Sequence, residues 1–262
     1  MTRFDGRVVL VSGSTGIAAA AAEALINAGA IVFVTSRTAD HVDNLVEELA
    51  VRSAGMAADL TREDGARSVV DACVARFGRL DGVYNVAGIS GRRFGDGALH
   101  ELTLEGWQTV ITSNLTSQML VCRAAVQQML KQEPAANGQR GVILNMSSVL
   151  ARHPSPEFFG THAYAASKGA IEAFSRSIAA TYAPQGIRVN VIAPALVATP
   201  MSARAQSDAQ IMDFVGRKQP LSGGALTADD LIGTALYLLS DDSRTVTGQV
   251  IDVDGGWSIT DP

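Results

Sequence analysis

Short apolar runs alternate with longer helix-forming segments along this 262-residue chain, and that alternation constrains the fold more than any other feature. The runs are rich in valine and isoleucine, which is typical of strands in a buried sheet. We expect strands at Val8–Val11, Ala30–Thr35, near Met56, Gly82–Val86, Val142–Met146, Ile187–Ala193 and Val250–Val253. We expect helices at Ile17–Ala28, 40–52, 63–77, 103–132, Ala163–Tyr182 and Ala228–Leu239, and a mobile segment at about 195–225.

Strands that alternate with helices are joined by right-handed crossovers, which produce a parallel sheet covered by helices on both faces. We therefore predict an α/β fold with a doubly wound, seven-stranded parallel sheet. Because 47% of the residues are hydrophobic and no low-complexity linker interrupts the chain, residues 1–262 are expected to form one domain around one large core.

Charge and composition exclude several classes of protein. The net charge is −5 and the chain has no stripe of lysine and arginine, so no nucleic-acid partner is expected. Cys73 and Cys122 form no CxxC pair and the four histidines lack ligand-like spacing, which argues against a disulfide framework and a metal site. The first strand pattern follows the N-terminus with no signal-peptide pattern before it, and no apolar run approaches the roughly 18 residues of a membrane span. We therefore expect a soluble, cytoplasmic protein.

The turn between the first expected strand and the first expected helix is rich in glycine and small polar residues. It contains Gly13, Ser14, Thr15, Gly16 and Ile17. Glycines at such a turn let the backbone approach a pyrophosphate, and the following helix offers free N–H groups at the positive end of its dipole. A glycine pair alone is weak evidence, because strand–helix turns use glycine for other reasons. Its position after the very first strand predicts dinucleotide binding.

The end of the second strand indicates which dinucleotide binds. A cofactor with a free ribose 2′-hydroxyl usually meets a carboxylate at this point. The chain has Ser36 and Arg37 there instead, and a guanidinium can pair with a 2′-phosphate. The pattern favours NADP(H) over NAD(H), the alternative being that Arg37 is an ordinary solvated residue.

Tyr164 and Lys168 lie four residues apart, on one face of an expected helix. A free tyrosine has a pKa near 10, and both the Lys168 ammonium and a cationic nicotinamide would favour the phenolate and lower that pKa. Such a tyrosine can exchange a proton with an alcohol or carbonyl oxygen. By itself this spacing is a weak signal, because chance supplies it in many chains.

Further motifs accompany the pair, and with them the chain resembles the short-chain dehydrogenase/reductase family over nearly its whole length. The matching pieces stand in order: the glycine loop, Asp59-Leu60, Asn85 to Gly88, Asn114, Ser148, Tyr164 with Lys168, Pro194 to Thr199, and Asp254-Gly255-Gly256. The resemblance implies a Rossmann-like fold and hydride transfer between NADP(H) and a carbonyl or secondary alcohol substrate.

The resemblance also implies a role for each matching residue. Tyr164 would be the general acid in reduction and the general base in oxidation, and Lys168 would lower its pKa and bind the nicotinamide ribose. Ser148 would donate a hydrogen bond to the substrate oxygen, and Asn114 would anchor a water between Lys168 and bulk solvent. The implied cofactor contacts are Asp59 and Leu60 at the adenine, Asn85, Ala87 and Gly88 at the ribose and sheet edge, and Pro194, Val197 and Thr199 at the nicotinamide. Taken singly, Asn114 and Ser148 could be structural, and Asp59 could be a helix N-cap.

The chain departs from the family pattern in several places. Only two residues separate Gly13 from Gly16, where the family usually has three, and Ala18 replaces the usual third glycine. A methyl group there narrows the space beside the pyrophosphate. Val86 replaces a second asparagine, Ala195 replaces a glycine, and an insert at 152–159 should reshape the substrate mouth.

The expected substrate walls are Ser90–Gly97, the insert, and Ala195–Val215, which would form an apolar flap unless its apolar residues are a helix's core face. Arg92-Arg93 would meet an anionic group or lie in a solvated loop. The helices at 103–132 and 163–182 resemble family helices that pair between subunits, which predicts a homotetramer or a dimer. Two other functions remain open: a non-redox reaction on the same fold, such as epimerisation or dehydration, and a non-catalytic cofactor-binding sensor or scaffold.

Overall fold

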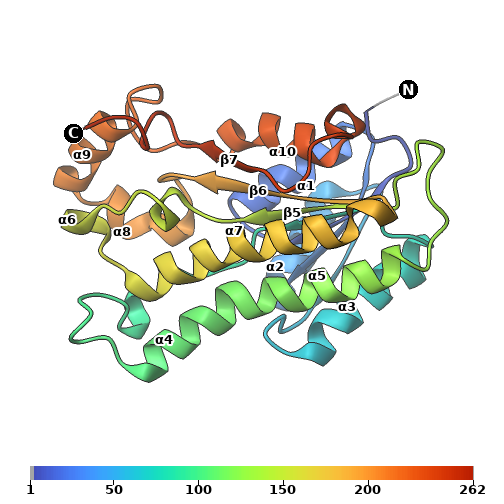
Figure 1. Ribbon diagram of the computed structural model, residues 1–262, viewed down its shortest axis with the longest axis horizontal. Helices are drawn as coiled ribbons and strands as arrows, with labels where there is room; N and C mark the ends of the chain where they lie inside the picture. The colour runs from blue at the N-terminus through green and yellow to red at the C-terminus, as the bar shows by residue number, and fades with distance from the viewer. Residues whose placement is uncertain (1–2, 262) are drawn as a thin grey trace.

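The computed structural model describes residues 3–261, and within them seven parallel strands form one sheet in the order β3-β2-β1-β4-β5-β6-β7 (Figure 1). The strands are β1 Val8–Ser12, β2 Ile31–Ser36, β3 Ser53–Ala57, β4 Gly82–Asn85, β5 Gly141–Met146, β6 Ile187–Pro194 and β7 Val250–Val253. Strand order reverses at β1, which pairs with β2 on one side and with β4 on the other. Such a reversal opens a crevice at the carboxyl ends of the strands, where ligands of doubly wound folds bind.

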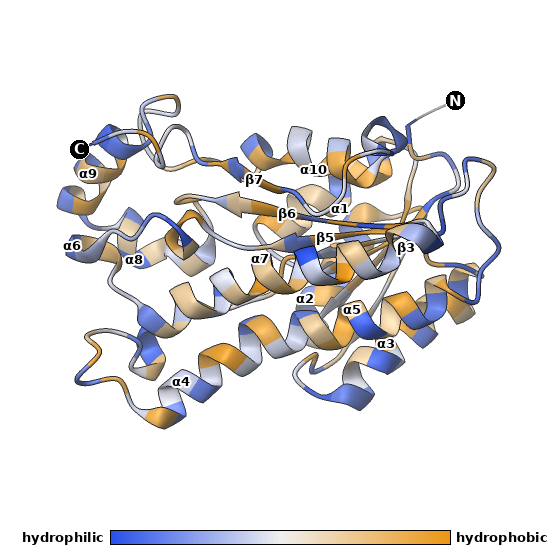
Figure 2. Cartoon of the chain, in the orientation of Figure 1, coloured by the Kyte–Doolittle hydropathy of each residue, from blue (hydrophilic) through white to orange (hydrophobic). Residues whose placement is uncertain are grey.

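Helices cover both faces of the sheet because successive strand residues point to opposite sides. Val9 and Val11 pack in one core with α1 Ile17–Asn27, α2 Ala39–Leu49 and α10 Ile232–Leu239. Val8 and Leu10 pack in the other core with α3 Glu63–Phe77, α5 Ser117–Met129 and α7 His162–Tyr182. Figure 2 places hydrophobic residues along the middle of the sheet and on the helix faces turned toward it. The predicted fold class is confirmed, with most element ends within one or two residues of expectation.

The single helix expected at 103–132 differs from what is observed. The structure has α4 Leu104–Ile111, then a π-helical turn at Thr112–Thr116, then α5. The wider π turn surrounds the buried Asn114, whose side chain is held by main-chain atoms of another segment. Turns of this kind occur often at functional sites.

The mobile segment expected at 195–225 is instead largely helical. It contains a 3-10 turn at Pro200–Ser202, α8 Ala203–Gln206 and α9 Ala209–Lys218. Ile211, Phe214 and Val215 are buried in a third cluster that also holds Trp257. The expectation of mobility failed because the apolar residues of this segment pack on Trp257, which lies near the C-terminus and could not be recognised as their neighbour from the local sequence.

Shorter elements complete the described chain. Short helical turns lie at Arg92–Phe94, Val149–Ala151, Ala183–Gln185, Asp229–Leu231 and Asp241–Ser243, and α6 spans Pro156–Phe159. In Figure 1, α6, α8 and α9 gather at the end of the molecule toward which the β6 arrow points. Of the helices formed by residues 3–261, none combines the length and hydrophobicity that crossing a membrane requires.

Candidate active site

A cavity of about 1000 Å³ opens at the carboxyl ends of the strands. One part is lined by the β1–α1 loop and by the ends of β2 and β3, and the other by the loop after β4, by α6 and α7, and by residues 194–205. Its size suits a dinucleotide together with a small substrate. The expected site residues line it, apart from Asn85 and Asn114.

The β1–α1 loop is shaped so that only glycine fits at two positions. Gly13 has φ +110°, and a Cβ there would lie 2.8 Å from the Ala18 methyl carbon. Gly16 has φ +55°, and its Cβ would lie 3.0 Å from Thr199 Cγ2. No side chain caps the start of α1 and its first turn has no acidic residue, so the helix end is open to an anion. The residues therefore fit a pyrophosphate, and the Ala18 methyl group is accommodated by the absence of a side chain at Gly13.

Ser36 and Arg37 lie at the rim of the cavity, at the end of β2. Asp59 lies on the same rim, and its Oδ1 accepts hydrogen bonds from Thr61 N at 3.0 Å and Thr61 Oγ1 at 2.7 Å. The Thr61 hydroxyl lowers the pKa of Asp59, and the charges of Arg37 and Arg62 lower it further. Because α3 begins at Glu63 with Arg62 in the capping position, Asp59 is not a helix N-cap.

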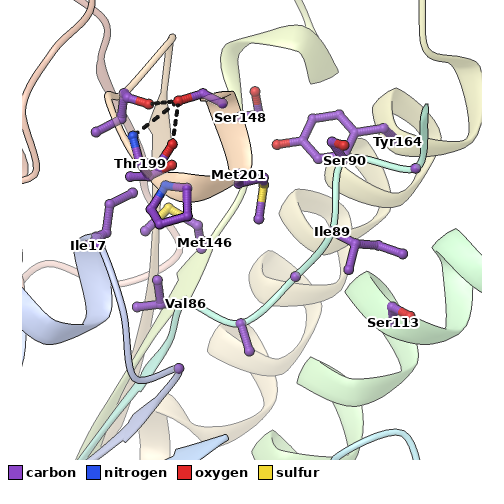
Figure 3. Close-up of a pocket in the computed structure, with 18 of the residues that line it drawn as sticks. Ile17, Val86, Ile89, Ser90, Ser113, Met146, Ser148, Tyr164, Thr199 and Met201 are labelled. Atoms are coloured by element: carbon purple, nitrogen blue, oxygen red, sulfur yellow. Dashed lines mark hydrogen bonds between the residues drawn. The ribbon is translucent and has the colours of Figure 1, made fainter. Parts of the chain in front are cut away.

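Tyr164 projects from α7 into the cavity, and Ser148 faces it from the end of β5 (Figure 3). Burial raises the pKa of Tyr164, while a hydrogen bond with the Ser148 hydroxyl opposes that rise. The phenol is therefore held in its protonated form. The Ser148 hydroxyl also donates to Pro194 O at 3.4 Å and accepts from Leu150 N at 3.3 Å.

Lys168 lies one turn further along α7 and is almost fully buried. Its Nζ donates to Met146 O at 2.9 Å and lies 5.5 Å from the centroid of the Tyr164 ring. Burial lowers the pKa of Lys168 to about 8. In the protein alone, burial is the largest influence on the phenol and raises its pKa, and the expectation that Lys168 lowers the pKa of Tyr164 stays a prediction.

Asn114 contributes to this site without lining the cavity. Its Oδ1 accepts from Ile89 N at 2.8 Å, and its Nδ2 donates to Ile89 O and Ser167 Oγ, both at 3.1 Å. Ser167 Oγ in turn donates to Tyr164 O at 2.7 Å. The Asn114 side chain has protein partners for both amide hydrogens and joins the loop after β4 to the turn of α7 that carries Tyr164, while its expected water-anchoring role stays a prediction.

Asn85 is turned away from the cavity. It is fully buried, and its Nδ2 donates to Asn145 Oδ1 at 2.8 Å and to Cys122 Sγ at 3.4 Å. The expectation that Asn85 contacts the cofactor is therefore not met, because its side chain joins β4 to β5 and α5. Ala87 and Gly88 do line the cavity.

The segment after β6 closes over the glycine loop. Thr199 N donates to Ser202 Oγ at 3.1 Å, and Ser202 Oγ donates to Val197 O at 2.5 Å. Figure 3 shows these bonds beside Ile17 of the first helix. Pro194, Val197 and Thr199 all line the cavity, between the glycine loop and Ser148.

The insert at 152–159 has two functions in the structure. Phe159 lines the cavity, whereas Arg152 forms ion pairs with the buried Glu172 of α7 and with Asp252 of β7. Phe158 packs on Phe214 with ring centroids 5.2 Å apart. The insert therefore forms part of the cavity wall, and it is anchored by the ion pairs of Arg152 and by the packing of Phe158 on Phe214.

Two residues of the site were missed by sequence reasoning. Asp96 is buried, and its carboxylate accepts from Ala163 N at 3.0 Å and Tyr164 N at 2.8 Å, so that it caps the start of α7 from a distant loop. Trp257 lines the cavity from the C-terminal segment. Neither has a local motif, since both act through contacts between segments far apart in the chain.

Comparisons with known proteins agree with this geometry. Residues 11–258 match the family model described as enoyl-(acyl carrier protein) reductase. The chain is 36% identical to momilactone A synthase of Oryza sativa subsp. japonica, over 98% of this chain and 92% of that protein. It is 31% identical to glucose 1-dehydrogenase 2 of Bacillus subtilis, over 98% of this chain and 96% of that protein. A solved structure of a short-chain type dehydrogenase/reductase from Mycobacterium ulcerans superposes with a TM-score of 0.88 at 31% identity, covering 98% of this chain and 91% of the other.

Proposed function

The chain belongs to the short-chain dehydrogenase/reductase family, and from that premise we propose that it interconverts a carbonyl compound and a secondary alcohol with NADP(H). The observation that carries the proposal is the meeting of Ser148, Tyr164 and Lys168 in the same cavity as the open end of α1. This arrangement brings a proton donor and an anion-binding helix end to one site.

Each of these side chains has a task in the reduction direction. When bound, a nicotinamide supplies the hydride that the carbonyl carbon gains. Tyr164 gives its phenolic proton to the carbonyl oxygen, and its raised pKa keeps that proton in place until the transfer. Ser148 donates a hydrogen bond to the same oxygen, where negative charge develops. The Lys168 ammonium then favours the phenolate that remains, until solvent returns a proton to it. In oxidation the phenolate accepts the alcohol proton.

The preference for NADP(H) rests on the end of β2. Arg37 is exposed at the cavity rim, and Ser36 stands where a carboxylate would be needed to bind a ribose 2′-hydroxyl. The one carboxylate nearby, Asp59, already accepts two hydrogen bonds from Thr61. A 2′-phosphate at Arg37 would form a charge-assisted pair there.

We further propose that the protein acts on a small molecule in the cytoplasm as a homotetramer. Leu104 and Trp107 of α4 remain exposed in the single chain, within the segment 103–132 that the family resemblance assigns to subunit pairing. An exposed apolar face of this kind is often an interface. Light scattering on a size-exclusion column would give the mass, and a monodisperse monomer would contradict the proposal.

One experiment tests cofactor and chemistry together. NADPH and NADH are titrated in parallel by cofactor fluorescence into wild type, Arg37→Ala and Tyr164→Phe, and each protein is then assayed on a panel of ketones. We expect Arg37→Ala to lose at least about 10-fold in NADPH affinity with little change for NADH, because a charge-assisted hydrogen bond is worth about 1.5–3 kcal/mol. We expect Tyr164→Phe to bind NADPH as wild type does and to have no measurable turnover.

The outcomes separate the parts of the proposal. Tighter binding of NADH by wild type would overturn the NADP(H) assignment alone. Turnover by Tyr164→Phe at a rate near that of wild type would remove Tyr164 from the chemistry. Binding of neither cofactor would mean that the shortened Gly13–Gly16 loop has disabled the site, whereas binding without turnover of any ketone would favour the sensor or scaffold alternative.

A further inference from the structure

Two arginines from distant segments converge on one neutral oxygen at the mouth of the cavity. Arg92 Nη2 donates to Phe158 O at 2.6 Å, and Arg204 Nη2 donates to the same oxygen at 3.2 Å. Arg92 follows β4 and Arg204 lies in α8, and both line the cavity. One arginine would suffice to hold this carbonyl group, so the second leaves positive charge that the carbonyl does not neutralise.

No carboxylate balances this charge within the part of the chain that the structure describes. Neither Arg92 nor Arg204 forms an ion pair there with an aspartate or glutamate. Asp96 is the carboxylate whose charge acts on Arg92, but its oxygens accept the N–H groups of Ala163 and Tyr164. Burial lowers the pKa of Arg92, and the charge of Arg204 lowers it further, which means that the two cations repel each other. Two cations held close together destabilise the unbound protein, and an anion bound between them would remove that repulsion.

Both arginines are held by ordered structure. Gly91 is buried with φ +82°, and a Cβ there would lie 2.7 Å from Val110 Cγ2, which fixes the path of the turn that carries Arg92. Phe158, whose carbonyl oxygen they share, is anchored by its ring on Phe214. Ala205, next to Arg204, is buried in the same aromatic cluster. A pair held in this way loses little conformational entropy when a ligand binds.

The pair is also tied to the proton donor. Arg92 and Asp96 lie in one short loop, and Asp96 binds the main-chain N–H of Tyr164 at 2.8 Å. Phe159, next to the shared carbonyl, and Trp257 line the same cavity with apolar rings. The lining of the cavity therefore combines a cationic pair, apolar rings and a proton donor.

We propose that Arg92 and Arg204 together bind an anionic group of the substrate, a carboxylate or a phosphate ester, while its carbonyl group faces Tyr164. The inference rests on the proposed function and names the substrate class: a ketone or secondary alcohol with an apolar body and an anionic end. Guanidinium groups bind both anions through charge-assisted hydrogen bonds. The carbonyl of Phe158 holds the pair in place when no substrate is present.

The test compares three ketones that differ only at the far end: 4-acetylbenzoate, 4-acetylphenyl phosphate and the neutral 4-acetylbenzamide. Each is titrated by calorimetry into protein saturated with NADP⁺, which cannot reduce the ketone, and again into protein without cofactor. The proteins are wild type, Arg92→Gln, Arg204→Gln and the control Arg76→Gln. Arg76 lies in α3, outside the lining of the cavity, and its guanidinium lies over the Phe77 ring at 5.5 Å, so the control removes the same charge away from the site.

We expect wild type to bind at least one of the two anionic ketones about 10-fold more tightly than the amide, because charge-assisted hydrogen bonds at a partly exposed site retain part of their strength. Arg92→Gln and Arg204→Gln should each lose most of that advantage and bind the amide as wild type does. Arg76→Gln should behave like wild type. The preferred anion distinguishes a carboxylate substrate from a phosphate ester.

Three results would overturn the proposal: equal affinity of wild type for all three ketones, no detectable binding of either anion, or an equal loss in Arg76→Gln. A parallel loss of anion and amide binding in both pair variants would assign the arginines to holding α6 and would equally overturn it. Failure of the proposed function looks different. In that case NADP⁺ does not bind or no ketone is reduced, while the preference for an anionic ketone and its loss in the two variants persist without cofactor.

Discussion

The two halves of the cavity are built in different ways. In the cofactor half, the glycine loop, Ser36 and Asp59 follow directly after β1, β2 and β3, so strand order alone brings them together. In the substrate half, α6, α9 and Trp257 come from segments far apart in the chain, and they are joined by side-chain packing of four aromatic rings. Backbone geometry specifies the first half and tertiary packing specifies the second. The cofactor half should therefore respond to changes at glycine, and the substrate half to changes in ring packing.

The largest expected effect is a loss of cofactor affinity that leaves ketone binding unchanged. Gly13→Ala places a methyl group 2.8 Å from the Ala18 methyl carbon at φ +110°. Backbone strain of this kind costs about 1–3 kcal/mol before the clash is counted, so we expect NADPH affinity to fall about 100-fold or more. Cofactor fluorescence measures the loss, and binding of the acetyl ketones to cofactor-free protein should be unchanged.

The double variant Gly13→Ala/Ala18→Gly is the matched control for that change. It removes the clash but keeps the strain at residue 13, so it should recover part of the lost affinity. An unchanged NADPH affinity in Gly13→Ala would mean that the cofactor does not approach this loop.

The next effect concerns Lys168, where the two halves meet. Because burial holds its folded pKa at about 8, below the ordinary value of 10.5, the buried ammonium destabilises the folded protein most at pH below 8. Lys168→Met should therefore raise the free energy of unfolding at pH 7 by up to about 3 kcal/mol, at about 1.4 kcal/mol per pKa unit. Met146 O keeps a donor in this variant, since Gln118 Nε2 also donates to it at 3.2 Å.

The pH dependence gives this prediction its sign. Between pH 8 and pH 10.5 the wild-type lysine loses its proton in the folded state and wild type gains stability. The gap, which is the difference in free energy of unfolding between Lys168→Met and wild type, should therefore shrink. Urea unfolding of both proteins at pH 7 and pH 10 measures the gap. A gap that is constant or that widens would show that Lys168 is not a destabilising charge. Turnover should be lost in the variant at both pH values.

The smallest expected effect concerns the packing of aromatic rings in the substrate half. Phe214 packs on Phe158, Phe159 and Trp257, with its ring centroid 5.2, 6.5 and 5.8 Å from theirs. Phe214→Leu should lower the free energy of unfolding by about 1–2 kcal/mol and raise KM for ketones, because aromatic pairs are worth about 0.5–1.5 kcal/mol beyond burial. NADPH affinity should stay within about 2-fold of wild type, since a change of 0.4 kcal/mol or less gives no more than about that ratio.

Phe33→Leu provides the comparison for that variant. Phe33 is equally buried, on β2, and meets Phe77 edge-on at 6.4 Å. It should lose a similar free energy of unfolding while KM for ketones stays as in wild type. If both variants change KM for ketones alike, the effect of Phe214→Leu comes from general destabilisation and not from ring packing in the substrate half.

These differences also explain what the sequence could predict. The alternation of strands and helices specified the sheet, and the glycine loop and the spacing of Tyr164 and Lys168 placed residues that do line the cavity. Asn85 was expected at the cofactor but joins β4 to β5, because a motif reports that a polar residue is present but does not indicate which neighbour its side chain meets. In 195–225 the sequence left a mobile apolar flap and a helix's core face both open, and it could not decide between them because the rings of Phe159 and Trp257, which cover Phe214, come from distant parts of the chain.

Asp96 has a consequence for protein engineering. It lies in the same loop as Arg92, and it holds the main-chain N–H groups at the start of the helix that carries Tyr164. A library that randomises residues 90–97 to obtain a new specificity would therefore also misalign Tyr164 in most of its members. Keeping Asp96 while varying its neighbours would separate the two traits, and a loop grafted from a relative would retain activity only if it brought its own acceptor for those two N–H groups.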